Sequence, residues 1–434
     1  MVSVRQRFDL FARARSFRLL FLAAFVSGLG TWLAIVALTI DVFDRTGSAK
    51  WVSALLIVGF LPGIVNGLLL GPFLDRLRRR RLMIASDLAN VAIFAALPFA
   101  NSATMLIVFA GLSGFANAFF RPVVYAALPN LVDERDLPNA NSLLNTVENL
   151  TITVGPLVSG VLVAAASPDA VYWINSVSFL ASFALVLRIP SRMLQAEQAL
   201  TRGHWRDLAE GFDLVRRSRP LLTVLATWCT AMFATSAINV AEVVLAKVVF
   251  DAGDFGFGLM VGAAGVGLTV GSFAVGSVID RRGIRAVYPA SLALMAIGVA
   301  GAAMSPSIWT AAACAVVLGT GNGGAVVSNA LLVQRGAPDR LRGRAFTVLM
   351  ASTQVCLGVG MIVAGRLTDA LGARWVWGYA AAIALVAAAV AWRLTRTIPE
   401  PTLEPQDIPA LAATAEPAPG AASGLLPGAG AAAD

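Results

Sequence analysis

The chain has 434 residues, of which 58% are hydrophobic and only 13% are charged, and its formal net charge is +8. A soluble domain carries about 25% charged residues, so this composition excludes a soluble globular protein and makes lipid the solvent for much of the chain. The basic residues cluster between apolar runs, which favours a role in membrane topology over binding to nucleic acid.

The chain begins with a basic stretch, Arg5 to Arg18, which we interpret as the start of a first helix rather than a cleaved signal. Twelve apolar segments follow, at about 17–43, 51–74, 82–100, 103–125, 140–166, 170–189, 220–250, 256–279, 286–304, 308–332, 344–371 and 374–397. Each is near the roughly 20 residues that span a bilayer core, and a segment of this length satisfies its backbone in lipid only as a helix. The predicted fold is an all-α membrane protein with twelve transmembrane helices.

The charges of the connecting segments predict the orientation. All but five of the Lys and Arg residues fall on one side of the predicted membrane; the exceptions are Arg45, Lys50, Lys247, Arg366 and Arg374. Because basic residues accumulate on the cytoplasmic side, we expect a multi-pass protein of the plasma membrane of a prokaryotic-type cell, with both termini cytoplasmic.

Four regions follow from the composition. We expect a six-helix bundle over residues 1–189, a cytoplasmic linker over 190–219, a second six-helix bundle over 220–397 and a disordered cytoplasmic tail over 398–434. Within the linker, apolar residues from Trp205 to Val215 recur at helical spacing, which predicts an amphipathic helix on the inner leaflet.

A short charged turn appears twice, 205 residues apart. Gly71-Pro72-Phe73-Leu74-Asp75-Arg76 is matched by Gly276-Ser277-Val278-Ile279-Asp280-Arg281, and Arg282-Gly283 follows the second copy. The same offset relates Gly155 and Gly160 to Gly360 and Gly365. A duplication of this kind predicts two pseudo-symmetric bundles related by an axis along the membrane normal.

Acidic residues inside the spans are few, and an ionised group in lipid must face a cavity, find a partner or bind a proton. Glu148 shares a polar helical face with Asn145, and it is our first candidate for proton coupling; a structural hydrogen bond is the alternative. Asp41, near the outer end of the span 17–43, and Glu242, in the outer half of the span 220–250, are further candidates, or else interfacial charges that reach water. We expect Asp87 to support the charged turn instead.

These motifs resemble those of the major facilitator superfamily. The turn Gly71-x-x-x-Asp75-Arg76 resembles its signature between the second and third helices, although Arg78 replaces a usual glycine that Gly283 retains in the second copy. Gly155-Pro156 and Gly160 resemble the motif associated with antiporters. The stretch from Phe119 to Pro129 resembles the branch of macrolide-efflux proteins and siderophore exporters. The helix-4 arginine tied to proton coupling in many drug antiporters has no clear equivalent here.

The resemblance implies two bundles around a central cavity that opens to one side at a time. The two turns would act as a conformational latch formed by Gly71, Asp75, Arg76, Gly276, Asp280, Arg281 and Gly283, with Asp75 against the start of span 344–371 and Asp280 against the start of span 140–166. The cavity would be lined by Phe25, Trp32, Asn145, Trp228 and Phe233.

The predicted function is secondary-active export of hydrophobic or amphipathic small molecules, of the drug, macrolide or siderophore type, by proton antiport. The alternatives are an importer of a small nutrient on the same fold and a membrane receptor that transports nothing. An enzyme is not expected, because the chain has one histidine and no nucleophile–histidine pair. We expect a monomer whose partners are substrate, protons and lipid, with no metal or cofactor and no nucleic acid.

Overall fold

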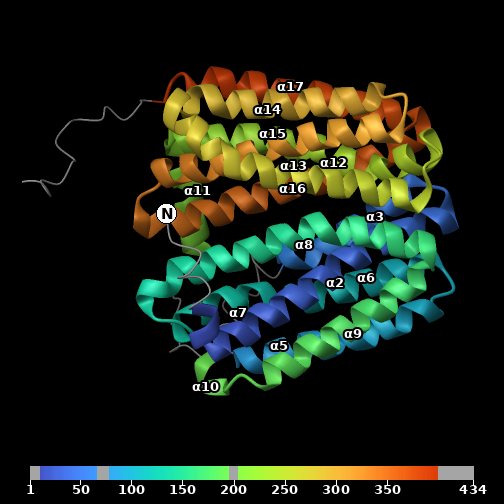
Figure 1. Cartoon of the computed structure of the whole chain (residues 1–434). Helices are drawn as coiled ribbons and strands as arrows, with labels where there is room; N and C mark the ends of the chain where they lie inside the picture. The colour runs from blue at the N-terminus through green and yellow to red at the C-terminus, as the bar shows by residue number, and fades with distance from the viewer. Residues whose placement is uncertain (1–9, 66–77, 195–203, 399–434) are drawn as a thin grey trace, which may run out of the picture. The chain divides into compact units, whose positions relative to one another are not determined.

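The structure is a computed structural model that describes residues 10–65, 78–194 and 204–398. Across these residues all regular structure is helical (Figure 1). The first half contains α2 (Arg15–Thr46), α3 (Ala49–Val65), α5 (Arg79–Ala96), η2 (Leu97–Phe99), α6 (Ala103–Asn117), α7 (Phe120–Ala127), η3 (Leu128–Asn130), η4 (Glu134–Asp136), α8 (Leu137–Ala165), α9 (Pro168–Leu187) and α10 (Ser191–Leu194). The second half contains α11 (His204–Arg217), α12 (Arg219–Val244), η5 (Leu245–Val249), α13 (Gly253–Arg282), α14 (Ile284–Met304), α15 (Ile308–Gly336), α16 (Asp339–Leu371) and α17 (Ala373–Thr395).

Eleven helices in the described part of the chain are long and apolar enough to cross a membrane. The span predicted at 51–74 corresponds to α3, whose apolar part is shorter, Ala49–Gly63, and whose described residues end at Val65. The all-helical membrane fold is therefore confirmed, and the number twelve stays a prediction. The span predicted at 103–125 is broken into α6 and α7 by a turn at residues 118–119.

Local sequence accounts for many of the helix ends. Ser102 and Ser167 accept hydrogen bonds from backbone N–H groups in the first turns of α6 and α9, and Ser307 forms a capping box on α15. Gly47 follows α2 with a φ of 60°, in the left-handed conformation that suits glycine at a helix C-terminus. These caps satisfy backbone groups that the short connections would otherwise leave unpaired.

The helices pack mainly within each half. In the first half α2 packs against α8 and α9, α5 against α9 and α6, and α3 against α6; in the second, α12 packs against α16 and α17, while α15 lies against α13 and α14. Two pairs make the main connections between the halves, α8 with α13 and α3 with α16, and α12 makes smaller contacts with α2 and α3. We call the two main connections the seam.

The connections lie at two ends of the helices (Figure 1). We call one the basic end: α5 and α8 begin there, α13 ends there, and it carries Arg79, Arg80 and Arg282. The opposite end, where α2, η5 and α16 end and α3 and α13 begin, we call the far end.

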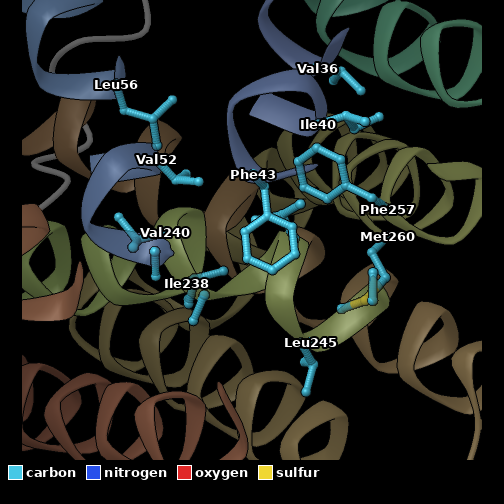
Figure 2. Close-up of a cluster of buried hydrophobic side chains, with 14 of the residues drawn as sticks. Val36, Ile40, Phe43, Val52, Leu56, Ile238, Val240, Leu245, Phe257 and Met260 are labelled. Carbon is cyan, nitrogen blue, oxygen red and sulfur yellow. The ribbon is translucent and has the colours of Figure 1, made fainter. Parts of the chain in front are cut away.

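A buried apolar cluster joins both halves toward the far end. Figure 2 shows part of it, with Val36, Ile40 and Phe43 from α2, Val52 and Leu56 from α3, and Ile238, Val240, Leu245, Phe257 and Met260 from α12, η5 and α13. At the same level Gly160 of α8 meets Gly258 of α13, where a Cβ added to Gly160 would lie 2.8 Å from the Gly258 Cα. Only glycine permits that approach, which agrees with the close helix packing expected of small residues in lipid.

The helix expected in the linker is present as α11, and it packs on α16. Val215 is buried, Gly211 lies against the backbone carbonyl of Arg344, and Glu210 forms an ion pair with Arg344. Phe212 remains exposed on another face. Part of its apolar surface therefore covers protein, and contact with the inner leaflet stays a prediction.

Candidate functional site

Two adjoining cavities lie among the helices of the first half. The first, of about 320 Å³, lies between α2, α7 and α8, and Trp32 and Glu148 are among its lining residues. The second, of about 410 Å³, lies between α2, α3 and α6 and is lined by apolar groups such as Leu55, Phe60 and Phe94. Thr31 and Asn117 border both cavities. Together the two cavities could hold a molecule that is largely apolar and carries polar groups at one end.

Glu148 is half-buried in α8 and contributes a carboxyl group to the wall of the first cavity. The Tyr125 hydroxyl, also in that wall, donates a hydrogen bond of 3.3 Å to the Oδ1 atom of Asn145. A carboxyl and a phenol therefore lie in the wall of a mostly apolar space, to which Ser27, Thr31, Asn117 and Thr151 add further polar groups, and the Asn145 amide adjoins this wall. This arrangement can bind a proton or a polar substrate group without lining the whole cavity with charge.

The other two acids predicted for proton coupling lie in different surroundings. Asp41 is 7% exposed, and its carboxylate accepts hydrogen bonds from Arg45, with Nε at 2.6 Å, and from the Tyr172 hydroxyl at 2.9 Å. Arg45 also donates to the Ala100 carbonyl, so this ion pair ties α2 to the far-end loop before α6. Glu242, in α12, is also 7% exposed and makes no hydrogen bond or ion pair with the described residues.

The residues predicted to line the cavity separate into two groups. Trp32 lines the first cavity, and Asn145 adjoins it through Tyr125. Phe25, Trp228 and Phe233 are not among the residues that line the two cavities. Trp228 is buried in α12, and Phe233 lies beside Gly360 of α16.

The antiporter-like motif connects α8 to two neighbours. A Cβ on Gly155 would come within 2.6 Å of the Trp32 Cβ, so this glycine allows Trp32 to lie against α8. Pro156 is buried inside α8, and the Ser159 hydroxyl donates to the Leu33 carbonyl at 2.7 Å. Gly160 faces α13, as described above. The motif thus contacts the cavity wall on one side and the seam on the other.

The predicted latch is described only in its second copy, because Gly71, Asp75 and Arg76 lie outside the described residues. Gly283 ends α13 with a φ of 74°. Asp280 and Arg281 are exposed and form no ion pair with any described residue, and a Cβ on Gly276 would meet nothing within 4 Å. The contacts expected of Asp75 and Asp280 with the starts of α16 and α8 therefore stay predictions.

Sequence reasoning missed a set of polar contacts at the far end. Asp369, near the end of α16, accepts hydrogen bonds from the Ser48 hydroxyl at 2.6 Å and from the Ala49 backbone N–H at 2.7 Å, so a carboxylate from the second half caps the N-terminus of α3. Lys50 lies 3.7 Å from the same carboxylate.

A second contact joins the halves beside it. The Lys247 ammonium of η5 donates to Asp44 of α2 and to Asp254 of α13, at 2.5 Å each. One cation therefore holds two acids, one from each half. We call Asp44, Lys247, Asp254 and Asp369 the far-end contacts. Among the described residues, no group of three or more side chains could hold a metal ion.

Comparison with known proteins gives one family and one fold. A family profile described as "Transmembrane secretion effector" matches residues 11–418. The chain is 28% identical over 371 residues to the multidrug efflux pump Tap of Mycolicibacterium fortuitum, covering 82% of this chain and 89% of the pump. It is 22% identical over 356 residues to macrolide efflux protein A of Streptococcus pyogenes, covering 76% and 83%. A bacterial homologue of the iron transporter ferroportin, in its inward-facing state, matches with a TM-score of 0.69 at 17% identity over 88% of this chain and 99% of that one.

Proposed function

Since the chain belongs to the transmembrane secretion effector family of major facilitator transporters, we propose that this membrane transporter exports hydrophobic or amphipathic small molecules by proton antiport with alternating access. The observation that carries the proposal is the pair of adjoining cavities. Both are lined mainly by apolar groups, one of them holds the Glu148 carboxyl, and both lie among the helices of the first half.

The relatives support export as the direction. The names of the two efflux proteins say that they remove drugs and macrolides, and the chain aligns with more than four-fifths of each of them. We assign the basic end to the cytoplasm, because arginine and lysine accumulate on that side of bacterial membrane proteins. Both termini would then be cytoplasmic, and the far-end contacts would face the outside.

Alternating access is supported by the state of the seam. At the far end the halves meet through Gly160 and Gly258 and through the far-end contacts. Toward the basic end, α8 and α13 border a cavity of about 300 Å³ that is lined by Asn149 and Phe273. A seam that is closed at the far end and less tightly packed toward the basic end is the arrangement expected of a transporter open toward the cytoplasm.

Of the three acids predicted to bind the coupling proton, Glu148 is the one that lines a candidate substrate cavity. The Asp41 carboxylate already accepts hydrogen bonds from Arg45 and Tyr172, and these contacts suit a structural role at the far end. Glu242 is enclosed and unpaired within the described residues, which fits a neutral acid. We propose that Glu148 binds a proton when the cavity is empty and releases it when substrate enters.

The experiment uses everted membrane vesicles that contain the full chain. A proton gradient should drive accumulation of a lipophilic dye, a macrolide or a siderophore, and Glu148→Gln should reduce this accumulation to the level of vesicles without the protein. Glu134→Gln, an exposed acid at the basic end, is the matched control and should behave as wild type. Undiminished accumulation by Glu148→Gln removes this residue from coupling, while no accumulation of any compound by wild type removes proton-driven export itself.

A further inference from the structure

A second carboxyl group lies fully enclosed in the first half. Asp87 of α5 is 0% exposed. Its Oδ2 atom accepts a hydrogen bond of 2.9 Å from the Ser182 hydroxyl of α9, and its Oδ1 atom is buried with no hydrogen-bond partner in the described part of the chain. An ionised carboxylate with an unmet oxygen inside a lipid-embedded helix bundle is costly, whereas the neutral acid is much less so.

The described side chains of the elements that pack against α5 provide no charged partner for this carboxyl. On α6 there is no charged residue, and on α9 there is only Asp169, thirteen residues before Ser182, or about 20 Å along the helix. The remaining titratable residues are Tyr172 on α9, whose hydroxyl donates to Asp41, Arg121 and Tyr125 on α7, the exposed Arg192 on α10, and Arg79, Arg80 and Arg81 at the start of α5.

The partners of the described basic groups lie elsewhere. Arg79 donates to the Ala126 carbonyl at 2.8 Å and Arg80 to the Leu187 carbonyl at 2.6 Å. The Tyr125 hydroxyl donates to Asn145. None of these described groups makes an ion pair with Asp87. No described basic side chain therefore offsets the free-energy cost of a negative charge on the Asp87 carboxyl.

One turn further along α5, a polar network leads from this region to the cavities. The buried Asn90 accepts a hydrogen bond of 2.7 Å from the Ser113 hydroxyl and donates one of 3.1 Å to the Oδ1 atom of Asn117. Asn117 donates back to Ser113 at 3.3 Å, which closes a ring of three side chains. Asn117 also borders both cavities. The ring therefore extends from the turn next to Asp87 to the wall of the candidate substrate site.

We propose that Asp87 is a proton-binding residue of the transport cycle, and that Asn90, Ser113 and Asn117 couple its protonation to the occupancy of the two cavities. The inference rests on the proton-driven export proposed above. On ionisation the carboxyl O–H bond breaks, the electron pair stays on the carboxylate, and the proton passes to water at the basic end.

The coupling follows from the hydrogen-bond donors that a charged Asp87 would require. The Asn90 amide lies on the same face of α5 one turn away, the spacing at which helix side chains meet, and its donors are now engaged with Asn117 and with the Ser86 carbonyl. If this amide turns toward a charged Asp87, its bond to Asn117 is lost. The wall shared by the two cavities then changes, so substrate and proton affect each other's binding.

The test compares two transport modes of purified protein in liposomes, with a dye that wild type accumulates as the probe. Asp87→Asn keeps the shape of the neutral acid, so we expect exchange of labelled for unlabelled dye without a gradient to stay within about twofold of wild type. Accumulation driven by a proton gradient should fall to background. Asp169→Asn, the acid at the far end of α9, is the control and should retain both modes.

A second variant tests the site if Asp87→Asn does not fold. Ser182→Ala removes the only described hydrogen bond to the carboxyl, so the pH profile of gradient-free dye binding should shift, and Ser178→Ala on the same helix should leave it unchanged.

Two results for Asp87→Asn overturn the inference. One is accumulation at the wild-type rate. The other is loss of both exchange and accumulation in a protein that inserts normally, because a purely structural role of Asp87 would give that result. If Asp87→Asn does not fold, an unmoved pH profile in Ser182→Ala overturns it too. If wild type exchanges dye but a proton gradient does not drive its accumulation, both the proposed proton antiport and this inference are wrong. If the gradient drives accumulation by wild type and by Asp87→Asn alike, only the assignment of Asp87 is wrong.

Discussion

The two ends of the seam differ although the same helices form both. At the far end, α3 and α16 approach so closely that the Ser53 hydroxyl donates to the Met361 carbonyl at 2.8 Å, and Asp369 caps α3. Nearer the basic end, a Cβ on Gly59 or Gly63 of α3, or on Gly358 of α16, would meet nothing within 4 Å.

The second pair of seam helices separates in the same direction. Gly160 and Gly258 touch, Thr153 and Thr269 are hydrogen-bonded at 3.2 Å, and beyond them Phe273 is 77% exposed beside the cavity that separates α8 from α13. The far end is therefore closed by the apolar cluster together with a few specific contacts between glycines and between charged groups. Breaking those specific contacts should let the halves separate at the far end.

The largest effect is expected from Gly160→Leu. Its side chain would overlap the backbone of α13 at Gly258, and overpacking of this kind costs about 1–3 kcal/mol. We expect the far end to remain apart and dye export to fall at least tenfold. Spin labels at the exposed Asn101 and Met304, in a background without native cysteine, measure the far-end distance. Gly378→Leu, where nothing lies within 4 Å of the added Cβ, is the control. An unchanged distance in Gly160→Leu would contradict the close approach.

A smaller effect is expected from Lys247→Met. Removal of the ammonium leaves Asp44 and Asp254 without their shared cation, and hydrogen bonds to charged groups contribute about 1.5–3 kcal/mol. The distance distribution between the two labels should gain a longer component, and export should fall several-fold. Lys247→Arg keeps the charge and should restore most of the closed population. A distribution in Lys247→Met that matches wild type would show that this contact does not hold the far end closed.

The smallest effect is expected from Asp369→Asn. The amide oxygen can still accept from Ser48 or Ala49, so the variant loses mainly the interaction of a charge with the helix N-terminus, about 0.3–2 kcal/mol. We expect a measurable shift in the label distances with export changed less than about fivefold. Lys50→Gln provides the comparison, because an exposed ion pair contributes roughly 0–1 kcal/mol. If Lys50→Gln shifts the distances more than Asp369→Asn, the cap is not the operative contact.

Much of the fold could be predicted from the sequence because lipid imposes a simple rule on length and polarity. Ten of the twelve apolar runs correspond to single described helices; the run 51–74 is described only to Val65, and the run 103–125 is broken into α6 and α7. The family resemblance inferred from the turn at Gly71 and the motif at Gly155 is confirmed by the matching family profile. The break between α6 and α7 was not predicted. Nothing in the apolar pattern distinguishes a bent helix from a straight one.

The site was less predictable because its contacts join distant residues. Lys247 and Asp44 are 203 positions apart, and no local pattern relates them. The Asp41–Arg45 pair is different, since a spacing of four on a helix is a readable signal for an ion pair. For Asp87, the sequence shows an acid near a basic cluster, but only the packing of α6 and α9 over it reveals that it is enclosed.

The π-helical turn η5 affects how the far-end contacts can change in evolution. A π turn accommodates about one extra residue, and one residue corresponds to roughly 100° of rotation in an α-helix. Lys247 lies inside this turn, so its direction depends on the length of the segment as well as on its chemistry. Deletion of Ala246 would turn Lys247 by roughly 100° relative to α12, away from both acids, while leaving all four residues of the far-end contacts in the sequence. Insertions and deletions at this point, more than substitutions, would alter how the far end closes.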